Sequence, residues 1–317
     1  MQTNELERPV RDEAPAVPTR GDDRFISLRY NRINIVGMNF DFLPNSAIAG
    51  VIECWKHRAW RKYIAATNPY SVILCRRDPE MYAATANAAL RLPDGVGITL
   101  AARLLGHGPH RRLTGPELTL ALCSSGRAFG FRHFFYGGGP GIADKLADNL
   151  CRLYPHLSVA GTCCPPYRLL SEEEDQRMVE QINAARPDIV WVGLGAPKQE
   201  KWMASHLRRI EATAMIGVGA AFDFHSGNVK WAPRWVRRAG LEWAYRLSCE
   251  PGRMWRRNLN SPVFLSLAVR QLLRSLFGRS QALDGETVGE IQYCPAPVAA
   301  GRVGRHDEGR EIRCIPR

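Results

Sequence analysis

One short block constrains the fold of this chain more than any other feature of its sequence. Residues 188–202 read DIVWVGLGAPKQEKW, in which an apolar run rich in β-branched residues ends at Gly193 and Gly195 and a polar, helix-forming segment starts at Lys198. Such a run is typical of a strand that is buried on both faces of a sheet. Glycines at its end let backbone amides approach a ligand at the carboxyl edge, where open α/β sheets bind ligands. Alone, the block also fits a glycine-rich turn without a ligand.

Two further segments repeat this strand–glycine–helix pattern. Residues 131–149 read FRHFFYGGGPGIADKLADN, and residues 213–223 read TAMIGVGAAFD. None of the three segments matches the dinucleotide fingerprint G-x-G-x-x-G with an acidic residue downstream, and the chain has no P-loop. Together they predict a doubly wound, Rossmann-like α/β sheet, largely parallel and flanked by helices, which binds a phosphate-bearing ligand other than NAD or ATP.

Other segments place polar residues on turns that follow predicted strands. The apolar segments 33–38 and 63–66 are strand candidates, and the second runs into Thr67 and Asn68 before a proline, which is a turn signature. A helical pattern covers residues 79–90.

The next loops carry the first candidate for chemistry. Asp94 follows a proline and precedes a glycine, so it lies on a constrained loop, although Asp-Gly is also common in plain turns. The polar cluster that begins at Arg112 is typical of a loop that enters a helix, with Thr114 as its N-cap.

Cysteine content indicates the expected compartment, and the composition of the two ends of the chain sets the expected domain boundaries. The nine cysteines of the 317 residues include no C-x-x-C pair, so neither a zinc site nor a disulfide framework is indicated, and a reducing cytoplasm is the expected compartment. Residues 1–24 are polar without an apolar core, so we expect no signal peptide there. We expect segments 1–24 and 279–317 to be disordered. Between them we expect a Rossmann-like domain over 25–233 and a basic amphipathic appendage over 234–278.

The appendage concentrates the formal net charge of +12. Arginines interleaved with Trp and Tyr suit an anionic membrane surface or a pyrophosphate-bearing lipid, and nucleic acid is the competing interpretation. The apolar stretch 262–278 contains Arg270 and Arg274 and is too short and too charged to span a bilayer. It could lie in the membrane interface as an amphipathic helix, or pack on the protein's own core.

Several chemistries lack their motifs. The chain has no G-x-S-x-G elbow and no H-E-x-x-H pair. The D-x-D pair of many metal-dependent sugar-nucleotide enzymes is also missing, because His225 stands two residues after Asp223. If a diphosphate leaves in the reaction, arginines must stabilise its charge in place of a metal, a task that suits their guanidinium groups.

Six blocks, in this order, closely resemble the WecG/TagA/CpsF family of bacterial glycosyltransferases: DGVGITLAARLLG, RLTGPELT, FYGGGPG, PDIVWVGLGAPKQEKWM, GVGAAFDFHSGNVKWAP, and GLEWAYRL followed by EPGRMWRR. The resemblance covers about residues 33–260. It implies a Rossmann-like fold and inverting transfer of a hexose-type sugar from a UDP-sugar to a polyprenyl-diphosphate-linked saccharide of a surface glycan. It also implies no cofactor, no metal requirement, and a basic appendage that docks on the anionic cytoplasmic face of the inner membrane and completes the site.

The resemblance also assigns roles to individual positions. The family's general base matches Asp94, and its threonine and asparagine fall on Thr67 and Asn68, although members often carry the threonine at the position of Ala66. Trp231 stands where many members have an arginine. With the loop residues above, the candidate substrate-binding set comprises Thr67, Asn68, Arg112, Thr114, Gly137, Gly138, Gly139, Gly195, Gln199, Asp223, Arg246, Arg253 and Arg256.

This chemistry agrees with the residues themselves. A carboxylate on a strand-end loop can accept the proton of an attacking hydroxyl, and glycine-loop amides, a helix N-terminus and arginines can stabilise departing UDP. Two other functional classes fit the sequence less well. A UDP-sugar epimerase or dehydrogenase would need the missing nicotinamide fingerprint. A nucleic-acid-binding protein would explain the charge but not the strand–glycine–helix blocks, so we expect no nucleic-acid partner. The sequence leaves the donor sugar, the acceptor glycan and the oligomeric state open.

Overall fold

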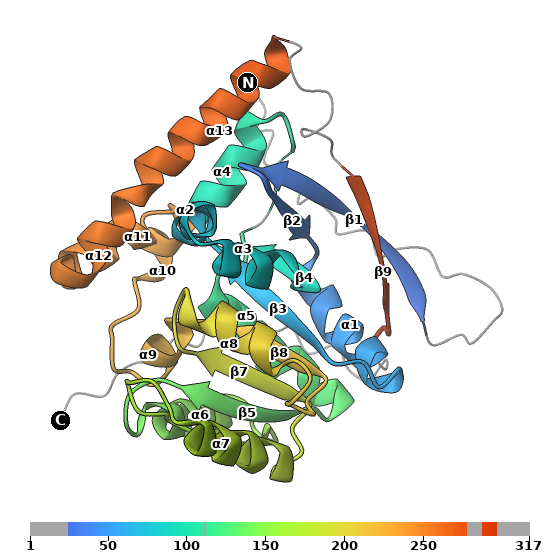
Figure 1. Ribbon diagram of the computed structural model, residues 1–317. Helices are drawn as coiled ribbons and strands as arrows, with labels where there is room; N and C mark the ends of the chain where they lie inside the picture. Colours follow the sequence, from blue (N-terminus) through green and yellow to red (C-terminus); the bar gives the residue numbers. More distant parts are fainter. Residues whose placement is uncertain (1–24, 109, 111, 278–286, 297–317) are drawn as a thin grey trace, which may run out of the picture.

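A six-stranded sheet forms the centre of the structure, a computed structural model that describes residues 25–108, 110, 112–277 and 287–296 (Figure 1). Its strand order is β4-β3-β8-β7-β5-β6, and every neighbouring pair is parallel. The strands are β3 (Lys62–Thr67), β4 (Leu90–Pro93), β5 (Arg132–Gly137), β6 (Ser158–Cys163), β7 (Ile189–Gly193) and β8 (Ala214–Gly217). The predicted α/β class and the strands of the three glycine-rich segments are confirmed.

Helices cover both faces of this sheet, which explains why its strands are apolar without alternation. Along β7, Ile189 and Trp191 belong to one buried cluster and Val190 and Val192 to another on the opposite face. The helices that contribute to the first cluster are α1 (Asn45–His57), α5 (Gly115–Ser125), α6 (Ile142–Leu153) and α9 (Ala221–His225). Those that contribute to the second are α7 (Glu172–Ala184) and α8 (Lys198–His206). A short 3₁₀ helix, Gly126–Phe129, follows α5.

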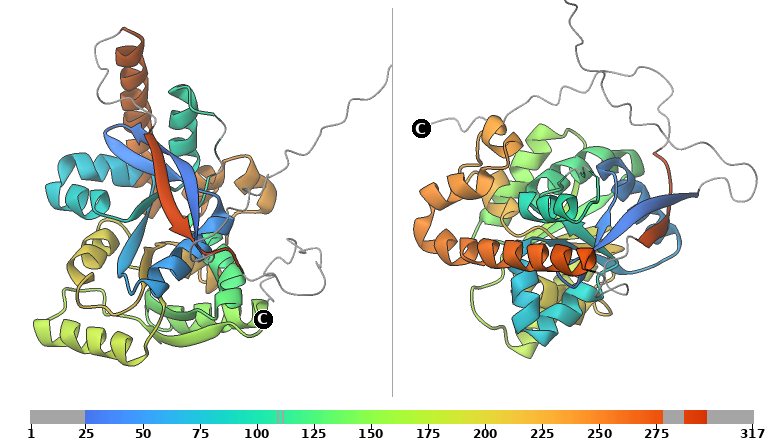
Figure 2. Two further views of the ribbon diagram at one scale, coloured as in Figure 1. Left: turned by 90° about the vertical axis from the view of Figure 1, so that its right-hand side faces the viewer. Right: turned by 90° about the horizontal axis from the view of Figure 1, so that it is seen from above.

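A second, antiparallel sheet lies beside the first, with the order β2-β1-β9 (Figures 1 and 2). Its strands are β1 (Ile26–Ile35), β2 (Met38–Phe42) and β9 (Thr287–Tyr293). The buried carboxylate of Asp41 joins the two sheets, because it accepts hydrogen bonds from the side chain of Arg32 at 2.6 Å and from the backbone N–H of Arg91 at 2.8 Å. This small sheet was not predicted.

A third buried cluster includes Ile33, Val72, Ile98 and Phe264. The helices that contribute to it are α2 (Pro69–Arg77), α3 (Pro79–Ala86), α4 (Val96–Leu104) and α13 (Asn260–Leu276). The other appendage helices are α10 (Arg234–Arg238), α11 (Glu242–Cys249) and α12 (Pro251–Asn258). The long helix α13 crosses the top of the molecule in Figure 1 and packs against α2 and α4. Its inner face buries Phe264 and Ala268, whereas Arg270, Leu273 and Arg274 are exposed. No helix of the described ranges is long and apolar enough to cross a membrane.

Three expectations require correction. The segment 33–38 is not one strand, because Val36 and Gly37 have positive φ angles of 55° and 84° and reverse the chain between β1 and β2. The helix expected over 79–90 ends at Ala86, since Leu90 begins β4 beside β3. Part of the expected disordered tail is a strand, β9, because the free edge of β1 offers it backbone partners from Ile26 to Arg32. Residues 1–24, 279–286 and 297–317 of the expected disordered segments lie outside the described residues.

Candidate active site

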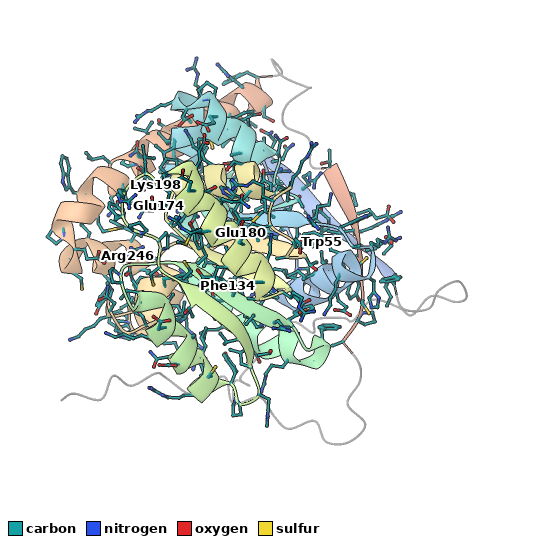
Figure 3. All side chains as sticks on the ribbon, turned by 60° about the horizontal axis from the view of Figure 1, so that its bottom comes forward. Trp55, Phe134, Glu174, Glu180, Lys198 and Arg246 are labelled. Carbon is teal, nitrogen blue, oxygen red and sulfur yellow. The ribbon has the colours of Figure 1, made fainter. Side chains whose placement is uncertain are left out.

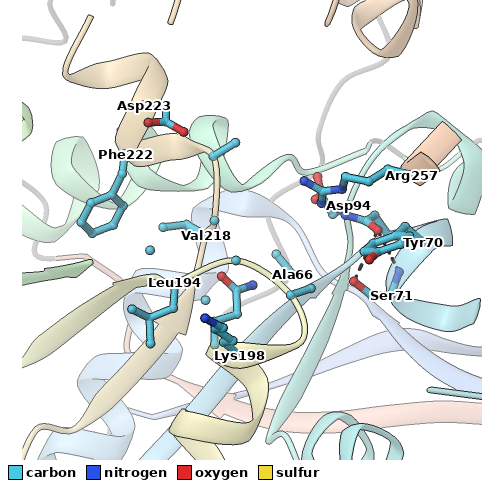
Figure 4. A pocket seen from close by; sticks show the side chains of 18 of the residues that line it. Ala66, Tyr70, Ser71, Asp94, Leu194, Lys198, Val218, Phe222, Asp223 and Arg257 are labelled. Atoms are coloured by element: carbon cyan, nitrogen blue, oxygen red, sulfur yellow. Dashed lines mark hydrogen bonds between the residues drawn. The ribbon is translucent and has the colours of Figure 1, made fainter. Parts of the chain in front are cut away.

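A cavity of about 1240 Å³ lies at the carboxyl ends of the parallel strands, where the appendage helices close over it. Residues that directly follow β3, β4, β5, β7 and β8 line it. Figure 4 shows Asp94 and Arg257 on one side and Phe222 and Asp223 on the other, with Leu194 and Val218 between them. This edge of the sheet is the one that the glycine-rich segments predicted.

Asp94 stands directly after β4, where its backbone is held in place. Its N–H donates to the carbonyl of Thr67 at 3.0 Å, and Gly95, with a φ of 85°, starts α4 immediately afterwards. The side-chain amide of Asn68 donates to the Asp94 carboxylate at 3.5 Å. Asn68 is itself fixed, because its Oδ1 caps α2 by accepting from the N–H of Ser71 at 3.0 Å. Asp94 is thereby oriented into the cavity.

The surroundings of Asp94 shift the pKa of its carboxyl group. Burial raises the pKa of Asp94 to about 6, and the nearby negative charge of Glu242 acts in the same direction. The hydrogen bond from Asn68 and the positive charges of Arg246 and Arg257 act against this rise. A carboxyl group with such a pKa is ionised at neutral pH and retains more basicity than an exposed aspartate, which suits a general base.

The appendage supplies two of the cations that line the cavity. Arg246 on α11 and Arg257 on α12 both line it. The guanidinium of Arg246 lies 5.1 Å from the ring centroid of Phe224, and that of Arg257 lies 5.0 Å from the ring centroid of Tyr70. The side chains of Arg253 and Arg256 lie outside what the structure describes. Figure 3 shows Arg246 and Lys198 on the same side of the molecule, and both border the cavity.

The glycine turns form the opposite part of the wall. Gly138, Gly139 and Gly195 line the cavity, and Gly138 and Gly195 adopt positive φ angles of 75° and 73°. Gly137 does not line it. A Cβ at Gly137 would lie 2.6 Å from the backbone carbon of Gly193, so this glycine serves the close approach of β5 and β7.

The loop before α5 also borders the cavity. Thr114 and Glu117 form a capping box at the start of this helix. Arg112 lies 4.0 Å from the carboxylate of Glu117, and both Arg112 and Thr114 line the cavity. Thr67 does not line it, because its side chain is buried at the end of β3 and its hydroxyl has no hydrogen-bond partner among the described residues.

Two further predicted residues lie near the sheet's centre. Gln199, in the first turn of α8, is buried against the Gly217–Gly219 turn. Asp223 on α9 accepts a hydrogen bond from the side chain of Asn228 at 3.1 Å. The structure therefore brings one set of predicted residues to the cavity: Asn68, Asp94, Arg112, Thr114, Gly138, Gly139, Gly195, Gln199, Asp223 and Arg246.

Among the wall residues that sequence reasoning missed are Tyr70, Lys198, Glu242 and Arg257. Arg257 follows Arg253 by one helical turn, so the helical period of α12 would have favoured it as a candidate. Trp231, in the place of the family's arginine, lies 3.8 Å from the guanidinium of Arg237 and stacks on Phe224 with a centroid separation of 5.9 Å.

Residues 33–277 match the profile of the glycosyl transferase WecG/TagA/CpsF family. The chain belongs to this family. The matched span covers the whole cavity, from Ala66 to Leu265, so the wall residues described above are those of a glycosyltransferase.

Curated relatives of this glycosyltransferase carry a specific name. A protein of Bacillus spizizenii is 30% identical over 208 residues, which cover 66% of this chain and 79% of the relative. A protein of Staphylococcus aureus is 27% identical over 244 residues, covering 74% of this chain and 91% of the relative. Both are named N-acetylglucosaminyldiphosphoundecaprenol N-acetyl-beta-D-mannosaminyltransferase.

Proposed function

We propose that this glycosyltransferase moves an N-acetylhexosamine, with N-acetylmannosamine as the first candidate, from a UDP-sugar to a polyprenyl-diphosphate-linked N-acetylglucosamine. Asp94 is the general base, and the anomeric configuration inverts. The observation that carries the proposal is the Asp94 carboxyl group, held in the cavity by Asn68 and influenced by the charges of Arg246 and Arg257. The names of the relatives support the choice of sugars.

The reaction divides between the two sides of the cavity. The acceptor hydroxyl gives its proton to Asp94 as its oxygen attacks the anomeric carbon of the donor sugar. The bond from that carbon to the diphosphate oxygen breaks, and UDP leaves with the bonding electron pair. Negative charge then grows on the diphosphate, where the amides of the turns at Gly138 and Gly195 and the appendage arginines would stabilise it.

The acceptor side of this proposal rests on the appendage. Arg246 and Arg257 line the cavity and would contact the departing diphosphate, while the outer face of α13 would lie against the anionic cytoplasmic surface of the membrane that holds the lipid-linked acceptor. Besides Arg270 and Arg274, this face exposes Val269, Leu273, Leu276 and Phe277. Apolar side chains among arginines suit the interface of an anionic bilayer.

The test is a product assay. The purified chain is incubated with a short-chain lipid diphosphate that carries N-acetylglucosamine, and with UDP-N-acetylmannosamine, UDP-N-acetylglucosamine or UDP-glucose in separate reactions. Mass spectrometry should detect the acceptor extended by one N-acetylhexosamine, and NMR should show inversion at the transferred carbon. An acceptor that remains unextended with every donor would contradict the proposal. Extension by glucose alone would contradict the assigned donor sugar.

A further inference from the structure

A buried carboxyl group lies behind the cavity wall, at Glu200 in the first turn of α8. Only 1% of Glu200 is exposed, and 4% of the neighbouring Gln199. The Glu200 Oε1 atom accepts a hydrogen bond from the Gln199 side-chain nitrogen at 2.9 Å, while Oε2 has no partner among the described residues. A buried carboxyl with so few hydrogen bonds costs folding free energy, so its presence requires an explanation.

The Glu200 contact determines which way the Gln199 amide points. Burial raises the pKa of Glu200 to about 7, so at pH 8 the group is mostly an ionised carboxylate. An ionised carboxylate has no hydrogen to donate, so it can be satisfied only by the NH₂ group of Gln199 and not by its carbonyl. That leaves the Gln199 carbonyl, Oε1, directed away from Glu200. This oxygen is buried and has no partner among the described residues.

The amide lies against the cavity wall. A Cβ at Gly217 would lie 3.1 Å from the Gln199 nitrogen, and one at Gly219 would lie 3.6 Å from its Oε1. Gly217, Gly219 and Gln199 all line the cavity. Figure 4 shows the start of α8, at Lys198, beside the turn that carries Val218. A buried acceptor without a partner at this position calls for a hydrogen-bond donor from a ligand.

We propose that Glu200 is a positioning residue that fixes the Gln199 carboxamide with its carbonyl toward the cavity, where it accepts a hydrogen bond from an N–H or O–H group of the donor nucleotide-sugar. The inference rests on the proposed function, because it takes the ligand to be a UDP-sugar.

The orientation also limits which part of the ligand Gln199 can meet. Diphosphate oxygens at neutral pH only accept hydrogen bonds, so they cannot pair with a carbonyl oxygen. The groups that can donate are the uracil N–H, the ribose hydroxyls, and the hydroxyls or the acetamido N–H of the transferred sugar. Gln199 therefore binds the nucleoside or the transferred sugar, and the glycine turns and arginines bind the charged diphosphate.

The test compares Glu200→Gln, Gln199→Ala and the double variant by calorimetric titration with UDP and with UDP-N-acetylmannosamine at pH 8. A glutamine at position 200 can offer either its NH₂ or its carbonyl to Gln199, so the polarity of the contact is lost while its shape is kept. We expect each single variant to bind the nucleotide-sugar roughly ten-fold more weakly, about the worth of one hydrogen bond. The double variant should bind no more weakly than Gln199→Ala, because both changes remove the same interaction.

A matched control is available on α7, where Glu180 accepts a hydrogen bond from the side chain of Gln176 at 3.0 Å on the exposed surface. Glu180→Gln should leave nucleotide affinity unchanged. The melting temperature of Glu200→Gln should equal or exceed that of the wild type, because the substitution removes a buried carboxyl group. A structural role for Glu200 would instead lower the melting temperature and leave affinity intact.

The outcomes separate the possibilities. Weaker binding of both ligands would place the contact on the nucleoside, and weaker binding of the nucleotide-sugar alone would place it on the transferred sugar. Wild-type affinity in Glu200→Gln, or effects that add in full in the double variant, would overturn the positioning role. A wild-type chain that bound neither ligand would contradict the proposed function as well as this inference.

Discussion

The guanidinium of Arg257 lies 5.0 Å from the centroid of the Tyr70 ring, so α12 of the appendage meets the first turn of α2 beside Asp94. Burial raises the pKa of both Asp94 and Glu200, and the positive charge of Arg257 acts against this rise in both carboxyl groups. The appendage therefore takes part in the electrostatics of the cavity in addition to covering it.

Substitution of Arg257 tests this contact. If Arg257 stabilises diphosphate charge, Arg257→Ala should lower kcat roughly 10²-fold, a loss similar to that of other single groups that stabilise transition-state charge. Arg208→Ala changes an exposed arginine that does not line the cavity, and it serves as the control. Equal turnover in the two variants would show that Arg257 has no part in the reaction.

The pH dependence of kcat/KM should report on Asp94. The base must be ionised, and its pKa is raised to about 6, so activity should fall as the pH drops below about 6 and level off above it. The negative charge of Glu242 contributes to the raised pKa, so Glu242→Gln should move the acid limb to lower pH. If the low-pH fall of kcat/KM stays at the same pH in Glu242→Gln, it does not come from the ionisation of Asp94.

Metal independence remains a prediction from the sequence. Among the described residues, no group of three or more His, Cys, Asp or Glu side chains is placed to hold a metal ion. If the arginines of the cavity stabilise the diphosphate charge, initial rates should be the same in excess EDTA as in Mg²⁺ or Mn²⁺. A loss of activity on chelation that Mg²⁺ or Mn²⁺ restores would show that a metal ion stabilises the diphosphate charge.

Membrane attachment can be tested on the exposed face of α13. Deletion of the appendage is unsuitable, because Phe264 and Ala268 are buried in the core. Replacement of both Arg270 and Arg274 by Gln should weaken binding to anionic liposomes roughly thirty-fold at low salt, at about 1 kcal/mol for each basic side chain. Turnover of a water-soluble acceptor should be unchanged. Wild-type liposome binding in the double variant would refute this attachment.

Local sequence patterns predicted the parts of the fold that depend on local structure. The buried strands β5, β7 and β8 have continuous apolar runs that end in glycine, and Thr114 is the N-cap of α5 that its loop context predicts. Asp94 was identified because a Pro-Asp-Gly turn after a strand fits the family's pattern.

Features that depend on distant contacts were missed. The strand β9 pairs with β1 from the other end of the chain, and its own sequence, TVGEIQY, is not distinctive. Arg257 reaches the cavity only because α12 packs beside Tyr70. Conversely, Gly137 and Thr67 do not line the cavity, since backbone packing of β5 on β7 and burial of the β3 end decide their positions. Ala66, where family members often carry the threonine, does line it.

The most direct test of the account is the turnover of Asp94→Asn together with its affinity for UDP. The substitution keeps the shape of the side chain and removes the base, so kcat should fall roughly 10²- to 10⁴-fold while calorimetry shows UDP affinity little changed. Near-normal kcat with intact UDP affinity would contradict the assignment of Asp94 as the general base.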